Sequence, residues 1–178
     1  MHGDETTGPA AARLLAAGRA PSRGMLLVLP EASPEALAAG TRTAPGHGDL
    51  NRAFPGSPEG DSAQRRAAAI FRLIEREKPD LVLDLHESDE YWDEGDGPVL
   101  VIPPLVSAAE IALSMLERPD MADFGYTGNP PAGSLAAEAA RLLGIPVLIV
   151  EVPDRLAPQE RITVFLRTVE AAQAALGM

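Results

Sequence analysis

The chain has 178 residues, of which 46% are hydrophobic and 23% charged, with a net charge of −11 and a pI near 4.6. These values are typical of one globular domain with a buried core, and the acidic balance argues against a nucleic-acid-binding protein with a basic surface. The sequence has no cysteine, which excludes disulfides and thiolate metal sites, and it has no apolar run long enough to cross a membrane. We therefore expect a single domain over residues 1–178, located in the cytoplasm.

Short apolar runs alternate along the chain with longer amphipathic segments. This alternation predicts an α/β fold built in layers. Each apolar run is rich in Val, Leu and Ile, as expected for strands that are covered on both faces. The predicted strands are Met25–Leu29, Leu81–His86, Val99–Ile102 and Pro146–Val152.

Five helices are predicted around these strands. Asp61 and Gln64 have the spacing of a capping box, which predicts a helix that runs to about Lys78. Gly18 and Gly144 follow two other amphipathic segments, at positions where glycine commonly ends a helix. The five predicted helices cover residues 9–17, 61–78, 107–116, 134–143 and the segment from about 158 onwards.

Residues 39–60 form a segment rich in Gly and Pro that lacks any periodicity. Loops of this length in a compact domain are usually either functional or disordered. This one contains Arg42, His47, Asn51 and Arg52, which favours a functional role, with His47 expected at the surface.

Two imidazoles and a carboxylate have a spacing that predicts a metal site. His2 and Glu5 are three positions apart, so one turn at the head of the first helix would direct both side chains to one ion. His86 ends a predicted strand, at the carboxyl edge where α/β proteins place their sites. These residue types suit a catalytic zinc, which needs three protein ligands and an open position for water.

The same residues also have structural interpretations. His-x-x-Glu alone is a weak match to a metal motif, and a histidine at the end of a buried strand is more often structural than a ligand. The chain has only three histidines, and two of them fall in these contexts, which favours the metal site. Glu87 and Ser88 follow His86 and are candidates for the wall of the same pocket.

Four short strings occur in one order along the chain: His-Gly-Asp-Glu at 2–5, Asp-Leu-Asn-Arg-Ala-Phe-Pro-Gly at 49–56, Asp-Leu-His-Glu-Ser at 84–88 and Val-Glu-Val-Pro at 150–153. In these strings the chain resembles the zinc carboxypeptidase superfamily, and within it the succinylglutamate desuccinylase/aspartoacylase branch. The resemblance covers residues 1 to about 153. It implies a three-layer α/β/α fold with a mixed, mostly parallel central sheet, as in the phosphorylase/hydrolase-like folds.

The resemblance also implies a role for the residues of each string. His2, Glu5 and His86 would hold one zinc ion per chain. Glu151 would be the general base that takes a proton from water. Asp49 would orient His2, because a ligating imidazole usually donates its second N–H to a carboxylate or carbonyl.

Three residues of the Gly- and Pro-rich loop are implied to contact substrate. The Asn51 and Arg52 pair would bind the substrate carboxylate, for which the planar fork of arginine is well suited. Arg42 would stabilise the oxyanion. The alternative is that both arginines are solvated loop residues. The aromatic residues Tyr91, Trp92 and Tyr126 are further candidates for substrate contact, and the sequence does not choose among them.

The chain departs from the family pattern at both ends. Family members normally have one or two strands before the first string, which here begins at residue 2. We therefore expect a domain that lacks its first strands, either because Met1 is an internal residue or because the protein is a shortened relative. Residues 152–178 predict one helix and no C-terminal accessory domain, so a more open cleft is expected.

The sequence thus favours a zinc-dependent hydrolase that cleaves an amide bond near a free carboxylate. Its substrate would be an N-acyl amino acid or, alternatively, the carboxyl end of a peptide or cell-wall peptide. A third interpretation is a non-catalytic remnant that binds carboxylate ligands. No nucleic-acid or membrane partner is expected, and the sequence does not define the oligomeric state.

Overall fold

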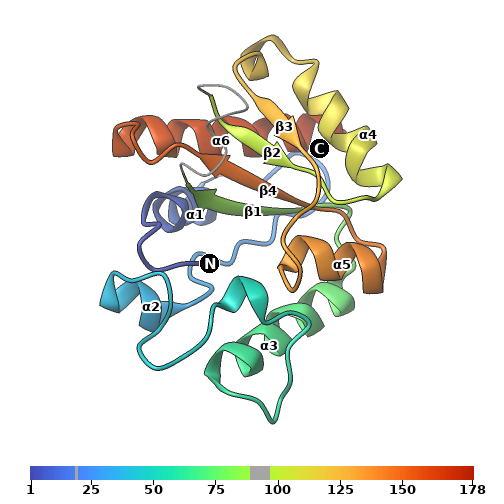
Figure 1. Cartoon of the computed structure of the whole chain (residues 1–178). Coiled ribbons are helices and arrows are strands. Elements are labelled where there is room, and N and C mark those ends of the chain that lie inside the picture. The colour runs from blue at the N-terminus through green and yellow to red at the C-terminus, as the bar shows by residue number, and fades with distance from the viewer. Residues whose placement is uncertain (19, 89–96) are drawn as a thin grey trace.

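The computed structural model describes residues 1–18, 20–88 and 97–178, and Figure 1 shows the path of the chain. Tyr91 and Trp92 lie outside these residues. The elements, in order, are α1 (Thr7–Ala17), α2 (Pro34–Ala39), the 3-10 turn η1 (Leu50–Arg52), α3 (Ser62–Glu77), β1 (Val82–Glu87), β2 (Val99–Val101), α4 (Val106–Leu116), the 3-10 turn η3 (Pro119–Met121), β3 (Gly125–Thr127), α5 (Leu135–Leu143), β4 (Val147–Val152) and α6 (Pro158–Ala175).

The strands form one sheet in the order β1-β4-β2-β3. β1 runs parallel to β4, and β2 runs parallel to β3, whereas β2 and β4 are antiparallel. The sheet is therefore mixed and mostly parallel, as predicted. β4 lies in its interior and brings Glu151 directly beside His86 of β1.

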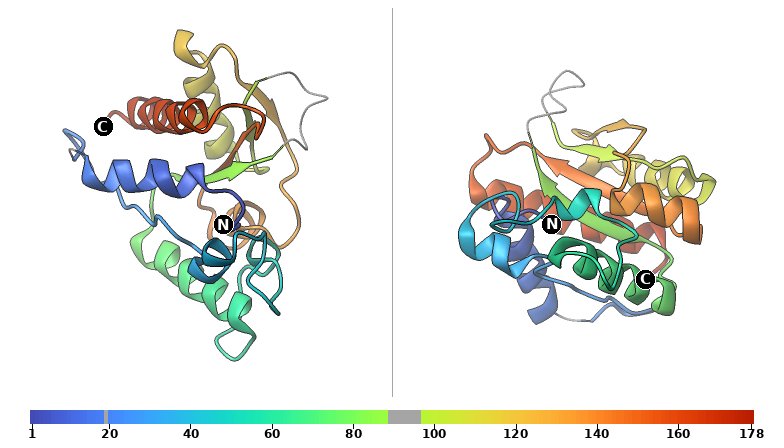
Figure 2. Two further views of the ribbon diagram at one scale, coloured as in Figure 1. Left: turned by 90° about the vertical axis from the view of Figure 1, so that its left-hand side faces the viewer. Right: turned by 60° about the horizontal axis from the view of Figure 1, so that its bottom comes forward.

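Helices cover both faces of the sheet, which confirms the three-layer α/β arrangement (Figures 1 and 2). Alternate residues of β4 explain how the layers are held. Leu148 and Val150 pack with helices α1, α4 and α6 in one core cluster. Val147 and Ile149 pack with α3 and α5 in the other. Because side chains alternate along a strand, Glu151 follows Val147 and Ile149 onto the α3/α5 face.

Helix ends follow the local signals of the sequence. At the start of α3, the Asp61 carboxylate accepts a hydrogen bond from Gln64 N at 2.9 Å, and the Gln64 side chain accepts one from Asp61 N at 3.1 Å. This is the predicted capping box. Gly144 ends α5 with φ 65°, a left-handed conformation that glycine adopts without steric cost.

The prediction of a strand at Met25–Leu29 is wrong. This segment is not part of the sheet, and it exposes Met25, Leu27 and Leu29 by 67%, 53% and 52%. A run of apolar residues becomes a strand only if a neighbour completes its backbone hydrogen bonds, and no strand in the described part of the chain pairs with this segment.

Besides the 3-10 turns η1 and η3, two short elements were not predicted. α2 has six residues, and β3 is a Gly-Tyr-Thr segment without an apolar run. β3 forms because it pairs with β2 at the edge of the sheet. This partner lies far away along the chain, so the residues of β3 alone do not predict a strand. Its Tyr126 side chain is 68% exposed. Among the described helices, none is long and apolar enough to span a lipid bilayer.

Candidate metal centre

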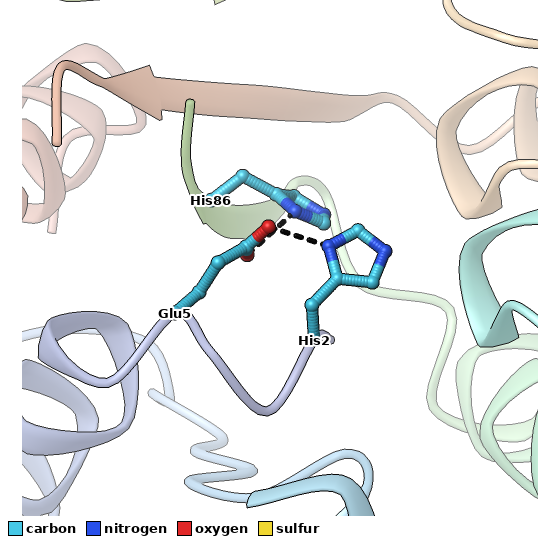
Figure 3. Close-up of side chains that lie close together, drawn as sticks. All are labelled: His2, Glu5 and His86. Carbon is cyan, nitrogen blue, oxygen red and sulfur yellow. Dashed lines mark hydrogen bonds and ion pairs between the residues drawn. The ribbon is translucent and has the colours of Figure 1, made fainter. Parts of the chain in front are cut away.

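His2, Glu5 and His86 come together although they belong to separate parts of the chain. His86 lies on β1, whereas His2 and Glu5 lie on the segment that precedes α1 (Figure 3). One ligand atom from each residue lies within 4.8 Å of the others. All three residues are buried, with exposed fractions of 4%, 7% and 2%. The structure therefore contains a possible metal-binding triad at the predicted residues.

The local conformation of the first two residues differs from the prediction. A bend, rather than a helical turn, separates His2 from Glu5, and α1 begins only at Thr7. Gly3 permits this path, because a Cβ at this position would lie 2.0 Å from the backbone of Ala36. The Gly3 N–H also donates to the carbonyl of Thr41 at 3.1 Å, which ties the segment to the end of α2.

Both imidazoles direct the same nitrogen at Glu5. His2 Nδ1 lies 2.5 Å from Glu5 Oε1, and His86 Nδ1 lies 2.9 Å from Glu5 Oε2. The ring centroids are 4.9 Å apart with an interplanar angle of 56°. Two nitrogens and two carboxylate oxygens thus converge on one small, buried volume.

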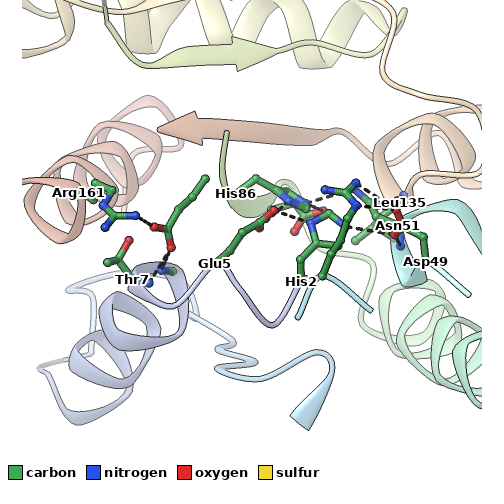
Figure 4. Close-up of polar contacts among 12 residues, drawn as sticks. His2, Glu5, Thr7, Asp49, Asn51, His86, Leu135 and Arg161 are labelled. Carbon is green, nitrogen blue, oxygen red and sulfur yellow. Dashed lines mark hydrogen bonds and ion pairs between the residues drawn. The ribbon is translucent and has the colours of Figure 1, made fainter. Parts of the chain in front are cut away.

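The opposite nitrogen of each ring contacts an aspartate. His2 Nε2 lies 3.1 Å from Asp49 Oδ1, and His86 Nε2 lies 3.1 Å from Asp84 Oδ2 (Figure 4). A carboxylate at Nε2 favours the tautomer that carries its proton there, which leaves the Nδ1 lone pair free toward Glu5. The sequence predicted that Asp49 would orient His2, and the two side chains are in contact.

Asp84 was missed as a contact of the site. Its signal was present in the string Asp-Leu-His, because residues two apart on a strand share one face of the sheet. Asp84 is 7% exposed and lies beside His86 on the α3/α5 face. Glu87, by contrast, does not line the pocket with His86, since it lies on the opposite face and contacts the start of α1.

The charges of the centre are strongly coupled. Burial raises the pKa of Glu5, but the nearby His86 and His2 outweigh burial and hold this pKa below its ordinary value. Burial lowers the pKa of His86, but Asp84 and Glu5 outweigh it, so the pKa of His86 lies well above its ordinary value. Protons and a metal ion would therefore compete for the same buried nitrogens.

The donor set fits a zinc ion. Two neutral imidazoles and one carboxylate are ligands of catalytic zinc sites. Glu5 Oε2 is buried and lies 2.9 Å from His86 Nδ1, so both atoms face the volume that a cation would take. The two flanking aspartates contact the rings and add negative charge around the triad.

Glu151 lies next to this centre on the same face of the sheet, in register with His86. Burial raises its pKa to about 7, an increase that His86 opposes and that the nearby carboxylates of Glu5 and Asp84 reinforce. Its Oε2 atom is buried and has no hydrogen-bond partner in the part of the chain that the structure describes. A carboxyl group that titrates near neutral pH is well suited to accept and return a proton.

The loop before α3 supplies the remaining predicted residues. Asn51 is buried at 3% exposure; its Nδ2 lies 3.2 Å from His86 Nε2, and its Oδ1 accepts from Leu135 N at 3.0 Å. Arg52 is exposed and donates through Nη1 to the Asn51 carbonyl at 2.8 Å. Asn51 therefore ties the loop to the start of α5 and lies against His86, and the exposed side chain of Arg52 folds back onto the Asn51 carbonyl.

Arg42 reaches the centre through Asp49. Its Nε and Nη2 atoms lie 3.1 Å and 3.0 Å from Asp49 Oδ2, and its side chain is 47% exposed. Burial raises the pKa of Asp49, but His2 and Arg42 outweigh burial and lower it. His47 lies exposed on the same loop, as predicted.

Comparison with known proteins defines the lineage. The family model described as succinylglutamate desuccinylase/aspartoacylase catalytic domain matches residues 1–176. The chain belongs to this family. This result confirms the resemblance that the four sequence strings indicated.

Individual proteins are similar to this chain over different portions of its length and of their own. The N-alpha-acetyl-L-2,4-diaminobutyric acid deacetylase of Halomonas elongata is 38% identical over 95 residues, which are 52% of this chain and 28% of that protein. An aspartoacylase family protein from Mesorhizobium loti is 28% identical with a TM-score of 0.76, over 99% of this chain and 55% of its own. Csd4 of Helicobacter pylori, a D,L-carboxypeptidase, shares the fold at 19% identity and a TM-score of 0.79, over 99% of this chain and 49% of Csd4. The chain thus spans only part of the length of these relatives.

Proposed function

We propose that the chain carries the active site of a zinc-dependent amide hydrolase, with N-acyl amino acids as its substrate class. The observation that carries this proposal is the convergence of His2, Glu5 and His86 on one buried point beside Glu151. Family membership and the deacetylase relative support the same assignment.

His2 and His86 through Nδ1, and Glu5 through its carboxylate, would hold the zinc ion. A zinc ion there would supply a Lewis acid, which polarises a carbonyl and lowers the pKa of a coordinated water to about 7. Asp49 and Asp84 hold the two imidazoles in the tautomer that leaves Nδ1 unprotonated.

Glu151 acts as the proton carrier. Its buried carboxyl accepts a proton from the attacking water and then delivers that proton to the nitrogen of the leaving amine. The pKa of about 7 applies to a centre without a cation, and a positive charge nearby favours the carboxylate form. The group would therefore be ionised and ready to act as a base when the centre is loaded.

Arg52 and Asn51 form the proposed carboxylate-binding pair. The guanidinium of Arg52 is exposed, whereas buried Asn51 fixes the backbone that carries it. Arg42 is the proposed oxyanion-stabilising residue, and its pairing with Asp49 places its positive charge next to His2.

The deacylase is favoured over the carboxypeptidase. The identity of 38% belongs to a relative named as a deacetylase, whereas Csd4 at 19% identity supports the fold alone. A panel of N-acetyl and N-succinyl amino acids, run beside peptides with free carboxyl ends, separates the two activities.

Zinc binding and turnover test the proposal together. We expect about one zinc ion per chain, loss of this zinc in His86→Ala, and retention in His47→Ala, whose histidine is exposed and outside the triad. Release of free amine from an acyl amino acid should accompany zinc loading. A protein that stays metal-free in the presence of zinc, and inert toward acyl amino acids and peptides, would instead be the non-catalytic remnant.

A further inference from the structure

Glu87 is a buried carboxylate that the proposed chemistry does not use. It follows His86 on β1 and therefore lies on the other face of the sheet, with Leu83 and Leu85, which pack against the α1/α4/α6 core. Its side chain is only 2% exposed. A buried carboxylate needs specific partners to offset the cost of its burial.

The partners of Glu87 come from two helices. Its Oε1 accepts hydrogen bonds from Thr7 N at 2.7 Å and from Gly8 N at 3.4 Å. Its Oε2 forms an ion pair with Arg161 of α6, whose side chain is 15% exposed. Figure 4 shows Thr7 and Arg161 together, to one side of the cluster of His2, Glu5 and His86.

Thr7 and Gly8 are the first two residues of α1. The N–H groups at the start of a helix have no partner within the helix, and the helix dipole makes this end partly positive. In α1 the N-cap residue Thr6 makes no side-chain capping hydrogen bond, and the first turn contains no acidic residue. Glu87, 80 positions away in sequence, takes the place of a local cap.

The same contact fixes the metal-binding segment. Glu5 lies two residues before Thr7, and His2 lies five residues before it, in a segment with no regular structure of its own. Gly8 packs closely on the strand, because a Cβ there would lie 3.2 Å from the Leu85 carbonyl oxygen. The residue that follows the strand-borne ligand thus anchors the segment that carries the other two.

We propose that Glu87 is a positioning residue for the metal centre: by capping α1 and pairing with Arg161, it holds His2 and Glu5 against His86. The inference rests on the proposed metal site but not on the identity of the substrate. It assigns to Glu87 a contribution to metal affinity in addition to its contribution to folding.

Zinc affinity, measured by competition with a chelator, tests the proposal alongside the thermal unfolding of the metal-free variants. Outer contacts of a metal site are worth about 10- to 100-fold in affinity, and we expect a loss of this size in Glu87→Ala. Asp123→Ala is the matched control. It breaks the ion pair of Arg167 on the same helix α6, where Arg167 Nη2 lies 2.8 Å from Asp123 Oδ2, away from the centre. We expect this control to lower stability without changing zinc affinity.

Glu87→Gln provides a milder variant that keeps an oxygen to accept from Thr7 N but loses the charge opposite Arg161. We expect its zinc affinity to lie between those of the wild type and Glu87→Ala, and it carries the test if Glu87→Ala does not fold. Unchanged zinc affinity in both Glu87 variants, with only a loss of stability, would overturn the proposal and leave the metal site intact. A wild-type protein that fails to bind zinc would overturn both the positioning role of Glu87 and the proposed function, whereas zinc binding without turnover would refute the hydrolase alone.

Discussion

The two halves of the metal centre are held in different ways. His86 belongs to β1, whose six residues are in register with β4 in the interior of the fold. His2 and Glu5 belong to an irregular segment that is held by single contacts to Thr41, Asp49 and Glu87. A strand distributes the positioning of a side chain over a ladder of hydrogen bonds, whereas the segment depends on each contact separately. The centre should therefore be robust on its strand side and sensitive on its segment side.

The largest effect is expected on the strand side, from a substitution that removes the proposed base on β4 and leaves the metal ligands in place. Glu151→Gln keeps the shape of the side chain but cannot accept a proton, so kcat should fall by about 10²- to 10⁴-fold while zinc is retained. Glu59→Gln, at an exposed position, is the control and should keep full turnover. Substantial turnover in Glu151→Gln would show that Glu151 is not the general base.

A substitution that changes no ligand tests the sensitivity of the segment. Gly3→Ala would place a Cβ 2.0 Å from the Ala36 backbone, so the segment between His2 and Glu5 must shift. Because a displacement of about 1 Å can cost about 100-fold in rate, we expect kcat/KM to fall by that order. In Gly48→Ala the added Cβ meets nothing within 4 Å, and we expect no change. Equal rates in the two variants would show that the segment is not position-sensitive.

The two aspartates compare the halves directly. Asp84→Asn and Asp49→Asn each weaken the hold on one imidazole, and both should reduce zinc affinity by about 10- to 100-fold. We expect the larger loss for Asp49, because it is one of the few contacts that hold the segment-borne His2, whereas the pairing of β1 with β4 also holds His86. A larger loss for Asp84, which is 7% exposed against 19% for the Asp49 side chain, would indicate that burial rather than position governs zinc affinity. Isothermal titration with zinc provides the comparison.

The smallest expected effect is a pH dependence of stability in the metal-free protein. The pKa of His86 is raised above its ordinary value, so the stability that it contributes is complete below about pH 6.5 and is lost as pH rises through the folded-state pKa. The pKa of Glu151, raised to about 7, makes folding less favourable as pH rises from its ordinary value toward 7. We expect the Tm of the metal-free protein to fall between about pH 5 and about pH 8, with a smaller fall in Glu151→Gln. A Tm that rises over this range would contradict the assigned directions.

The sequence predicted those parts of the fold that local chemistry determines. β1, β2 and β4 lie within a residue or two of their predicted bounds, and the Asp61–Gln64 capping box starts α3 where expected. The segment Met25–Leu29 has an equally apolar pattern but no neighbouring strand, and pairing is not a local property. β3 shows the converse, because it gains its structure from β2 without an apolar run of its own.

The site shows the same division between local and distant information. The strings predicted that His2, Glu5 and His86 would meet, and the structure brings them together. They did not predict that Asp84 would contact His86, although its spacing along the strand carried the signal. The contact between Glu87 and the start of α1 could not be predicted, since it joins residues 80 positions apart across two layers. The roles of Glu151, Arg42, Asn51 and Arg52 in chemistry and binding remain predictions.

The central claim is that one zinc ion sits between the strand-borne and the segment-borne ligands. Anomalous diffraction at the zinc absorption edge, from crystals of the zinc-loaded protein, tests it most directly. We predict one strong peak within about 2.0–2.2 Å of His2 Nδ1, His86 Nδ1 and a carboxylate oxygen of Glu5. A peak coordinated by other residues, or no peak at this position, would contradict the account.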